Sequence, residues 1–205
     1  MKSHPILFSA PMVRALLTGS KTQTRRIVKP QSAVLTPQMC ANMGVKPLPE
    51  KSKPVIECPY GNPGDQLWVK ETSRLNIGSE ESVIQYRADM AIAEITDGWF
   101  SDDPVLRRWI WGQSIKPEGW RPSIHMPRRA SRITLEITSA RVERLHEISE
   151  QDAMAEGVNW KEFAGLASKT ARKLYRELWE SINGAGSWDA NPWVWVVEFL
   201  AVQNI

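Results

Sequence analysis

The sequence has few of the residues on which disulfide frameworks and metal sites depend. Its 205 residues include two cysteines, Cys40 and Cys58, and three histidines, His4, His125 and His146. Two cysteines cannot make a disulfide framework, and no CxxC or HxxxH spacing accompanies them. We therefore expect reduced thiols, no metal site and no cofactor.

Long apolar runs are also missing. No run reaches the roughly 18 residues that a membrane-spanning helix needs. Near the first residue, Pro5, Pro11 and Arg14 interrupt what would be the apolar region of a signal peptide. These features predict a cytoplasmic protein with no membrane partner.

The sequence lacks the familiar enzyme motifs. It contains no P-loop, no GxGxxG run, no Ser-His-Asp pattern and no evident pair of catalytic carboxylates. Any chemistry must therefore come from a less common set of residues.

Tryptophan, in contrast, is abundant: the chain has 10 Trp against 3 Tyr and 4 Phe. Each Trp can bury roughly 150–250 Å², so these rings either fill a core or stack on rings such as nucleobases. Four lie on expected strands or an apolar helix face, which favours packing: Trp68, Trp179, Trp193 and Trp195. The others lie in expected insertions or beside turns: Trp99, Trp109, Trp111, Trp120, Trp160 and Trp188. For contact with a base, Trp120 and Trp68 are the first candidates.

Basic residues gather in two segments. Residues 1–58 carry a charge of +7, and the total of +3 leaves −4 for the remainder. A second group of arginines follows later: Arg121, Arg128, Arg129, Arg132, Arg141 and Arg144. The two segments either converge on a face that attracts phosphate or form a solvated surface neutralised by nearby acids.

Turn residues and hydrophobic periodicity predict a mixed α+β domain covering 1–205. Strands are expected near 5–8, 66–71, 83–87, 131–137 and 192–202, and helices near 10–18, 150–156 and 169–183. The segment 20–28 is polar and basic, which predicts that it stays out of the core. The proline-rich stretch 30–63 and the irregular stretch 74–119 are expected to be insertions.

The most informative segment is Gly-Ser-Lys-Thr-Gln-Thr-Arg-Arg at 19–26. A lysine placed where a helix ends and a strand begins can be desolvated, which lowers its pKa toward that of a general base. A neighbouring threonine hydroxyl can then attack an acyl carbon. Lys-Thr pairs are also common in basic loops, so the spacing alone leaves both interpretations open.

These residues carry a resemblance to a known family. Gly19, Lys21, Thr22, Thr24 and Arg26, after a helix, resemble the opening motif of the ASCH domain, a relative of the PUA-like RNA-binding barrels. Residues 64–69 are similar to its second signature, and 131–158 to its later strand and short helix. Residues 58–61, 120–124 and 191–195 resemble prophage-encoded ASCH proteins. The resemblance implies a PUA-like β-barrel with flanking helices and the two long insertions.

The resemblance also implies a function. Small bacterial ASCH proteins include amidohydrolases that deacetylate N4-acetylcytidine with a Lys, a Thr and a Glu, which match Lys21, Thr24 and Glu156. In this scheme Lys21 is the base, Thr24 or a water attacks the acetyl carbonyl, and Glu156 protonates the leaving amine. The last turn of a helix disfavours negative charge, which suits a proton donor. Strict strand alternation separates Lys21 from Thr24, so the chain must turn between 20 and 23 for them to meet.

Candidate substrate-binding residues accompany this scheme: Arg26, Trp68, Trp120, Arg128, Arg129 and Arg132. Two alternatives stay open. The protein is either a non-catalytic RNA or modified-base binder, in which tryptophan stacks on a base, or an ASCH-type ribonuclease. In every case the expected partner is a nucleoside or RNA, and nothing in the sequence indicates an oligomeric state.

Overall fold

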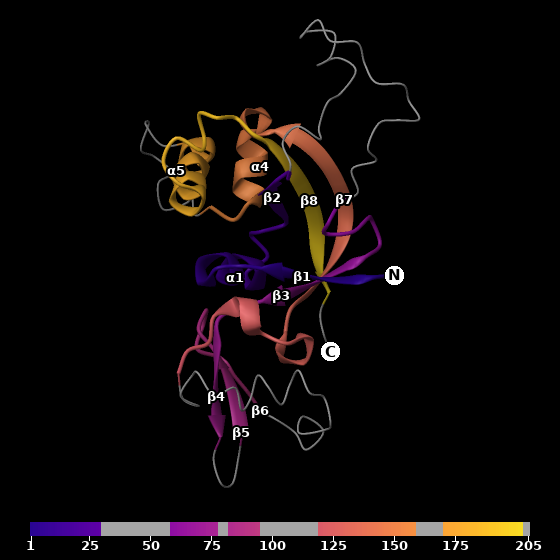
Figure 1. Cartoon of the computed structure of the whole chain (residues 1–205), viewed down its shortest axis with the longest axis vertical. Coiled ribbons are helices and arrows are strands. Elements are labelled where there is room, and N and C mark those ends of the chain that lie inside the picture. Colours follow the sequence, from indigo (N-terminus) through magenta and orange to yellow (C-terminus); the bar gives the residue numbers. More distant parts are fainter. Residues whose placement is uncertain (30–57, 78–81, 95–118, 159–169, 203–205) are drawn as a thin grey trace, which may run out of the picture.

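The computed structural model describes residues 1–29, 58–77, 82–94, 119–158 and 170–202 (Figure 1). They form a mixed α+β fold, as expected. The helices are α1 (Ala10–Leu17), α4 (Glu150–Ala155) and α5 (Ala171–Asn183), with short 3-10 helices η4 (Ser123–His125), η5 (Arg128–Ala130) and η6 (Leu145–Glu147). The strands are β1 (Ser3–Leu7), β2 (Gln23–Ile27), β3 (Gln66–Lys70), β4 (Ser73–Ile77), β5 (Ser82–Tyr86), β6 (Ile92–Glu94), β7 (Thr134–Arg144) and β8 (Trp193–Val202).

The main sheet has five strands in the order β1-β3-β7-β8-β2. β1 runs parallel to β3, and the other neighbours are antiparallel. β7 and β8 pair from Thr134↔Val202 to Arg144↔Trp193, with an irregularity between Ile137 and Ser139, and they curve together along one side of the molecule (Figure 1). Within the described residues, no pairing joins the edge strands β1 and β2.

Local signals set the ends of the helices. Ser9 precedes α1, which has proline in its first turn, and Gly19 follows it with a φ of 72°. The Ser149 hydroxyl accepts from Asp152 N, and the Asp152 carboxylate accepts from Ser149 N, which caps α4. These signals explain why the expected helices appear close to their predicted bounds.

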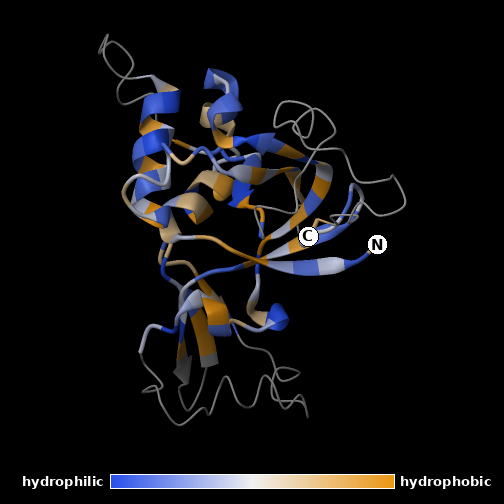
Figure 2. Ribbon diagram, turned by 45° about the horizontal axis from the view of Figure 1, so that its top comes forward, coloured by the Kyte–Doolittle hydropathy of each residue, from blue (hydrophilic) through white to orange (hydrophobic). Residues whose placement is uncertain are grey.

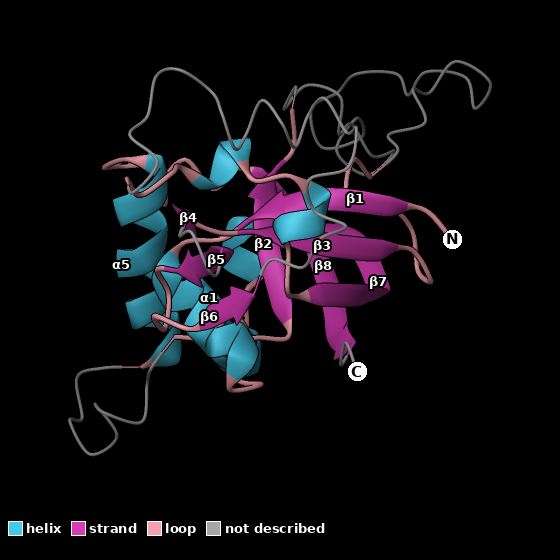
Figure 3. Ribbon diagram, turned by 90° about the horizontal axis from the view of Figure 1, so that it is seen from below, coloured by secondary structure: helices cyan, strands magenta, loops and turns pink. Residues whose placement is uncertain are grey.

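Two apolar clusters hold the main sheet against its helices. One packs α1 residues Val13 and Leu16 against strand residues such as Val69 and Phe199. The other packs α4 and α5 against β8, and in Figure 3 α1 and α5 lie to the left of the main-sheet strands β1, β3, β7 and β8. Along α5 hydrophilic and hydrophobic residues alternate (Figure 2), as expected for a helix with one buried face.

A second sheet, in the order β4-β5-β6, occupies part of the stretch predicted as an insertion at 74–119. The strand predicted near 83–87 is β5. Leu75, Ile84 and Tyr86 pack with Met126 and Ala130 into a third cluster. The remainder of this stretch, and residues 30–57 of the first predicted insertion, lie outside the described residues.

The expectation that segment 20–28 stays out of the core is wrong. Lys21, Gln23 and Thr24 are each 2% exposed, and Arg25 is 4% exposed. β2 pairs with β8. The carboxylates of Glu143, Asp152 and Glu156 neutralise the cations of Lys21 and Arg25. A polar strand can therefore be buried here because its charges are paired.

The tryptophans divide differently from the prediction. Trp179 and Trp195 are buried as expected, but Trp188, expected beside a turn outside the minimal domain, is 6% exposed. It packs against Tyr175 and His146. Trp99, Trp109, Trp111 and Trp160 lie outside the described residues. No helix in the described ranges is both long enough and apolar enough to cross a membrane.

Candidate active site

Lys21 occupies the junction between α1 and β2, where the chain turns before the strand begins. Its backbone N–H donates to the Ala15 carbonyl at 3.0 Å, and the next residue, Thr22, donates to Ala155 at 2.8 Å. These bonds tie the junction to both α1 and α4, and Lys21 forms an isolated antiparallel bridge with Glu156. The backbone therefore brings Lys21 to the C-terminal end of α4.

The Lys21 ammonium is enclosed by acceptors. Nζ donates to Glu156 Oε2 at 2.8 Å, to the Glu156 carbonyl at 2.9 Å and to the Gln23 carbonyl at 2.8 Å. An ammonium has three donors, so all of them are engaged. Burial lowers the pKa of Lys21, while the Glu156 carboxylate acts in the opposite direction. The expected desolvation of this lysine is thus confirmed.

Glu156 connects this lysine to a buried arginine. Its carboxylate is 3% exposed, and Oε1 lies 3.4 Å from Nη1 of Arg25. Nη2 of Arg25 lies 3.3 Å from both Glu143 and Asp152. Two buried cations, Lys21 and Arg25, and three carboxylates, of which Glu156 is buried and Glu143 and Asp152 are partly exposed, therefore form one network that fixes the position of Glu156.

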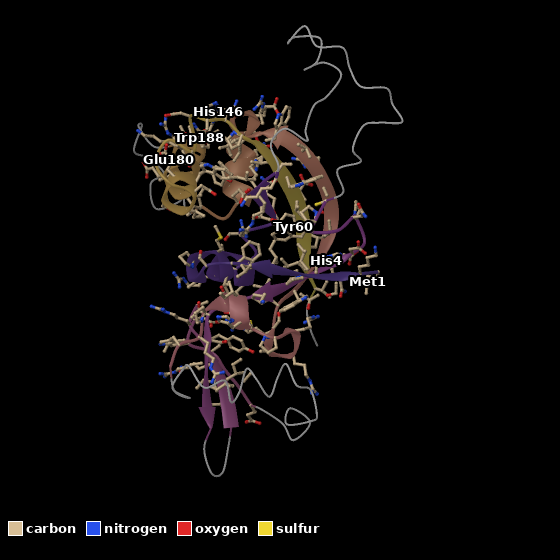
Figure 4. The ribbon with its side chains drawn as sticks, viewed as in Figure 1. Met1, His4, Tyr60, His146, Glu180 and Trp188 are labelled. Atoms are coloured by element: carbon tan, nitrogen blue, oxygen red, sulfur yellow. The ribbon has the colours of Figure 1, made fainter. Side chains whose placement is uncertain are left out.

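A cavity of about 220 Å³ opens beside this network. Its polar wall consists of Thr24, Arg25, Arg26, Lys29, Tyr60 and Glu156, and Tyr60 is labelled near the middle of the view in Figure 4. The remaining lining residues come from α1, β2 and α5: Met12, Ile27, Tyr175, Leu178, Trp179, Ile182 and Asn183. Thr24, Arg26 and Glu156 thus meet as predicted, whereas Lys21 does not line the cavity and contacts Glu156 instead.

Arg26 approaches the cavity from β2. Its Nη2 donates to the Leu7 carbonyl at 2.6 Å, and its guanidinium lies 5.3 Å from the centre of the Phe8 ring. The same ring is 5.5 Å from Lys21 Nζ. Phe8 therefore stabilises two neighbouring cations.

The other predicted binding residues lie elsewhere, and none of them lines the cavity. On β3, the Trp68 ring centre is 5.4 Å from Lys70 Nζ and 5.9 Å from the Arg128 guanidinium. Trp120 lies near two guanidiniums, those of Arg74 at 5.0 Å and Arg87 at 5.8 Å. These rings belong to a separate basic and aromatic part of the fold.

Arg132 is an ion-pairing residue that joins the two sheets. Its guanidinium donates to Glu71 at 2.9 and 3.0 Å and to Asp89 at 2.8 and 2.9 Å, and it lies 4.1 Å from the Tyr86 ring centre. Arg129 is exposed on η5. The arginines of 121–144 therefore do not converge on the cavity, although Arg25 and Arg26 of the first basic segment reach it.

Of the lining residues, sequence reasoning named Thr24, Arg26 and Glu156 as site residues, and those that it missed include Arg25, Tyr60, Tyr175 and Trp179. Tyr60 lies in the Cys-Pro-Tyr-Gly segment that carries part of the family resemblance. Tyr175 and Trp179 belong to the apolar stripe of α5, which indicates packing but not a cavity. Arg25 had no signal, because its carboxylate partners are distant in the sequence.

The described part of the chain contains no group of three or more His, Cys, Asp or Glu residues arranged to hold a metal ion. The polar groups of the cavity are the cations, carboxylate and hydroxyls of its lining residues. Comparison of the chain with models of protein families, with curated proteins and with solved structures finds no match.

Proposed function

We propose that this protein is an amidohydrolase that deacetylates N4-acetylcytidine or a similar acylated nucleoside, on a PUA-like fold of the ASCH type. The observation that carries this proposal is the contact of Lys21 with Glu156, 135 residues away, at 2.8 Å and out of contact with solvent. Thr24 and Glu156 line one cavity next to this contact. The curved, irregular pairing of β7 with β8 supports the barrel-like assignment.

The size of the cavity favours a small substrate. Its volume of about 220 Å³ lies below the ~300–1,000 Å³ of clefts that hold drug-sized ligands. A cavity of this volume suits one planar ring better than a folded polynucleotide. A single acylated base is therefore the better substrate.

Glu156 is the residue best placed to move a proton. Lys21 and Arg25 hold its carboxylate in one position at the cavity wall. All three ammonium donors of Lys21 are engaged, so in this proposal Lys21 is a positioning residue rather than the general base. This role differs from the one that the family resemblance implies.

The reaction then proceeds in two steps, transfer of the acetyl group to Thr24 and hydrolysis of the resulting ester. The Thr24 hydroxyl gives its proton to Glu156, and its oxygen forms a bond to the acetyl carbonyl carbon. As the C–N bond breaks, Glu156 passes the proton to the departing amine. Water then hydrolyses the acetyl ester on Thr24 and releases acetate. Arg26, at the same wall, stabilises the negative charge on the tetrahedral carbonyl oxygen.

The test is acetate release from N4-acetylcytidine, followed by NMR with purified protein. We expect turnover by the parent protein and a loss of at least about 100-fold in Thr24→Val, which keeps the side-chain shape but removes the hydroxyl. Thr22→Val is the matched control, because Thr22 is exposed and does not line the cavity. Equal turnover by Thr24→Val and the parent would contradict the assignment.

A second candidate function is binding of RNA, and one observation favours it. Trp120 lies close to the guanidiniums of Arg74 and Arg87, which combines a stacking ring with phosphate-binding cations. If RNA binds here, affinity falls steeply with added salt, and Trp120→Ala weakens binding by about 5- to 150-fold, the range of one lost base stack. Fluorescence anisotropy with a labelled single-stranded RNA measures both. Salt-independent binding that Trp120→Ala leaves unchanged excludes this surface.

A further inference from the structure

Three residues that line the cavity carry buried hydrogen-bond donors for which the described part of the chain provides no acceptor. Among the described residues, the buried nitrogen atoms that have no hydrogen-bond partner include Nε of Arg25, Nε of Arg26 and Nε1 of Trp179. All three residues line the cavity. They come from β2 and α5, which are far apart in the sequence. Unsatisfied buried donors are rare and costly in native proteins, so their gathering at one cavity indicates a ligand that supplies acceptors.

The charge of the cavity wall narrows the type of acceptor. Arg25 is already balanced by Glu143, Asp152 and Glu156. Arg26 makes no ion pair with any residue of the described ranges, and Lys29 adds a second cation to the lining. A neutral carbonyl would satisfy one donor but leave these cations unbalanced. An anionic oxygen group satisfies the donors and the charge together.

We infer that the cavity is an anion site, which binds its ligand through a carboxylate or phosphate group held by Arg25, Arg26 and Trp179. The apolar wall from α5 then takes an apolar or planar body attached to that group. The inference adds the charge of the ligand to the proposed function. It rests on that function only for the identity of the planar group, which would be a nucleobase. The anion is therefore either a phosphate, as in an acylated nucleotide, or a carboxylate, such as the acetate released by hydrolysis.

Binding can be measured without turnover, so failure of this inference and failure of the proposed hydrolysis are distinguishable. The probes are inorganic phosphate, acetate, cytidine monophosphate and the neutral nucleoside cytidine, titrated by calorimetry against the full chain. We expect saturable binding of the anions and tighter binding of cytidine monophosphate than of cytidine. Preference for phosphate or for acetate identifies the source of the anion.

Two variants locate the site. Trp179→Phe removes the indole N–H and keeps an aromatic ring, and we expect it to weaken anion binding about tenfold or more. The matched control is Trp188→Phe, which alters a buried tryptophan of the same apolar cluster that does not line the cavity. Arg26→Lys keeps the charge but loses the planar fork, and it should also weaken binding.

Three results would overturn the inference. They are the absence of saturable binding of both phosphate and acetate, an affinity for neutral cytidine at least as high as that for every anion tested, and equal losses in Trp179→Phe and Trp188→Phe. If Trp179→Phe does not fold, Arg26→Lys decides the outcome, because Arg26 is only partly buried.

Discussion

Replacing Glu156 with alanine is expected to lower the free energy of unfolding by about 3–5 kcal/mol. The substitution removes the carboxylate that Lys21 Nζ contacts at 2.8 Å in a site closed to solvent. Arg25 keeps two other carboxylates, but Lys21 keeps only the carbonyl oxygens of residues 23 and 156. A buried ammonium without a counter-charge is costly, because carbonyl dipoles replace only part of its hydration. Urea denaturation near neutral pH measures the loss.

An exposed ion pair provides the control for this substitution. Arg176 and Glu180 are one helical turn apart on α5, with their charged atoms 3.7 Å from each other and partly exposed. Glu180→Ala is expected to change stability by no more than about 0.5 kcal/mol. If Glu156→Ala costs as little as Glu180→Ala, the buried contact between Lys21 and Glu156 does not form in solution.

The contact between Lys21 and Glu156 also predicts how the stability of the protein depends on pH. Glu156→Gln keeps the shape of the side chain but removes the charge that opposes the effect of burial on Lys21. The pKa of Lys21 then falls further below its ordinary value of 10.5. Between the lowered pKa and the ordinary one, the unfolded chain binds more protons than the folded one, so stability rises with pH. The destabilisation caused by Glu156→Gln should therefore be larger near neutral pH than near pH 10, and a loss that is the same at both would exclude this explanation.

Elements with local signals were predictable from the sequence. Ser149 and Asp152 cap α4, and Gly184 ends α5 with a φ of 95°. Alternation identified the first part of β7, and a nearly continuous apolar run identified β8. Such patterns and caps are properties of neighbouring residues, so they can be read from the sequence. The placement of Lys21, Thr24 and Glu156 near one another came from the family resemblance and not from periodicity, which separates Lys21 from Thr24.

Features that depend on pairing across the fold were not predictable. The basic composition of 20–28 indicated exposure, but acids from β7 and α4 allow Arg25 to be buried. For the later arginines the sequence left both a phosphate-binding face and a surface neutralised by nearby acids open. Arg132 pairs with Glu71 and Asp89, and Arg141 pairs with Glu143 and Glu198, which agrees with the second interpretation for these two arginines. The distribution of charge along the chain does not show which acidic residues the folded strands place next to each arginine.

Gly157 links the stability of the fold to the geometry of the site. It follows α4 with a φ of 84°, a conformation that L residues other than glycine adopt at a cost of about 1–2 kcal/mol. A Cβ at this position would lie 2.8 Å from the Cβ of Ala15 and 2.9 Å from the Cβ of Lys21. Both atoms are attached directly to backbone, so neither can move away without shifting α1 or the chain segment that carries Lys21.

Gly157→Ala is therefore expected to destabilise the protein by about 2–5 kcal/mol, the sum of backbone strain and overpacking. The matched control is Gly186→Ala, where φ is 76° but nothing lies within 4 Å of the added Cβ, so only the strain of about 1–2 kcal/mol applies. Adding Ala15→Gly to Gly157→Ala removes the contact with the Cβ of residue 15. We expect the double variant to regain part of the stability that Gly157→Ala loses beyond Gly186→Ala, even after the roughly 1 kcal/mol cost of glycine within a helix. Urea denaturation of the four variants, Ala15→Gly alone included, gives the coupling between the two positions. Because the displaced segment carries Lys21, Gly157→Ala should also lower acetate release more than Gly186→Ala does. Equal losses of stability in the two glycine variants would show that α1, Lys21 and the end of α4 are not packed as closely as this site requires.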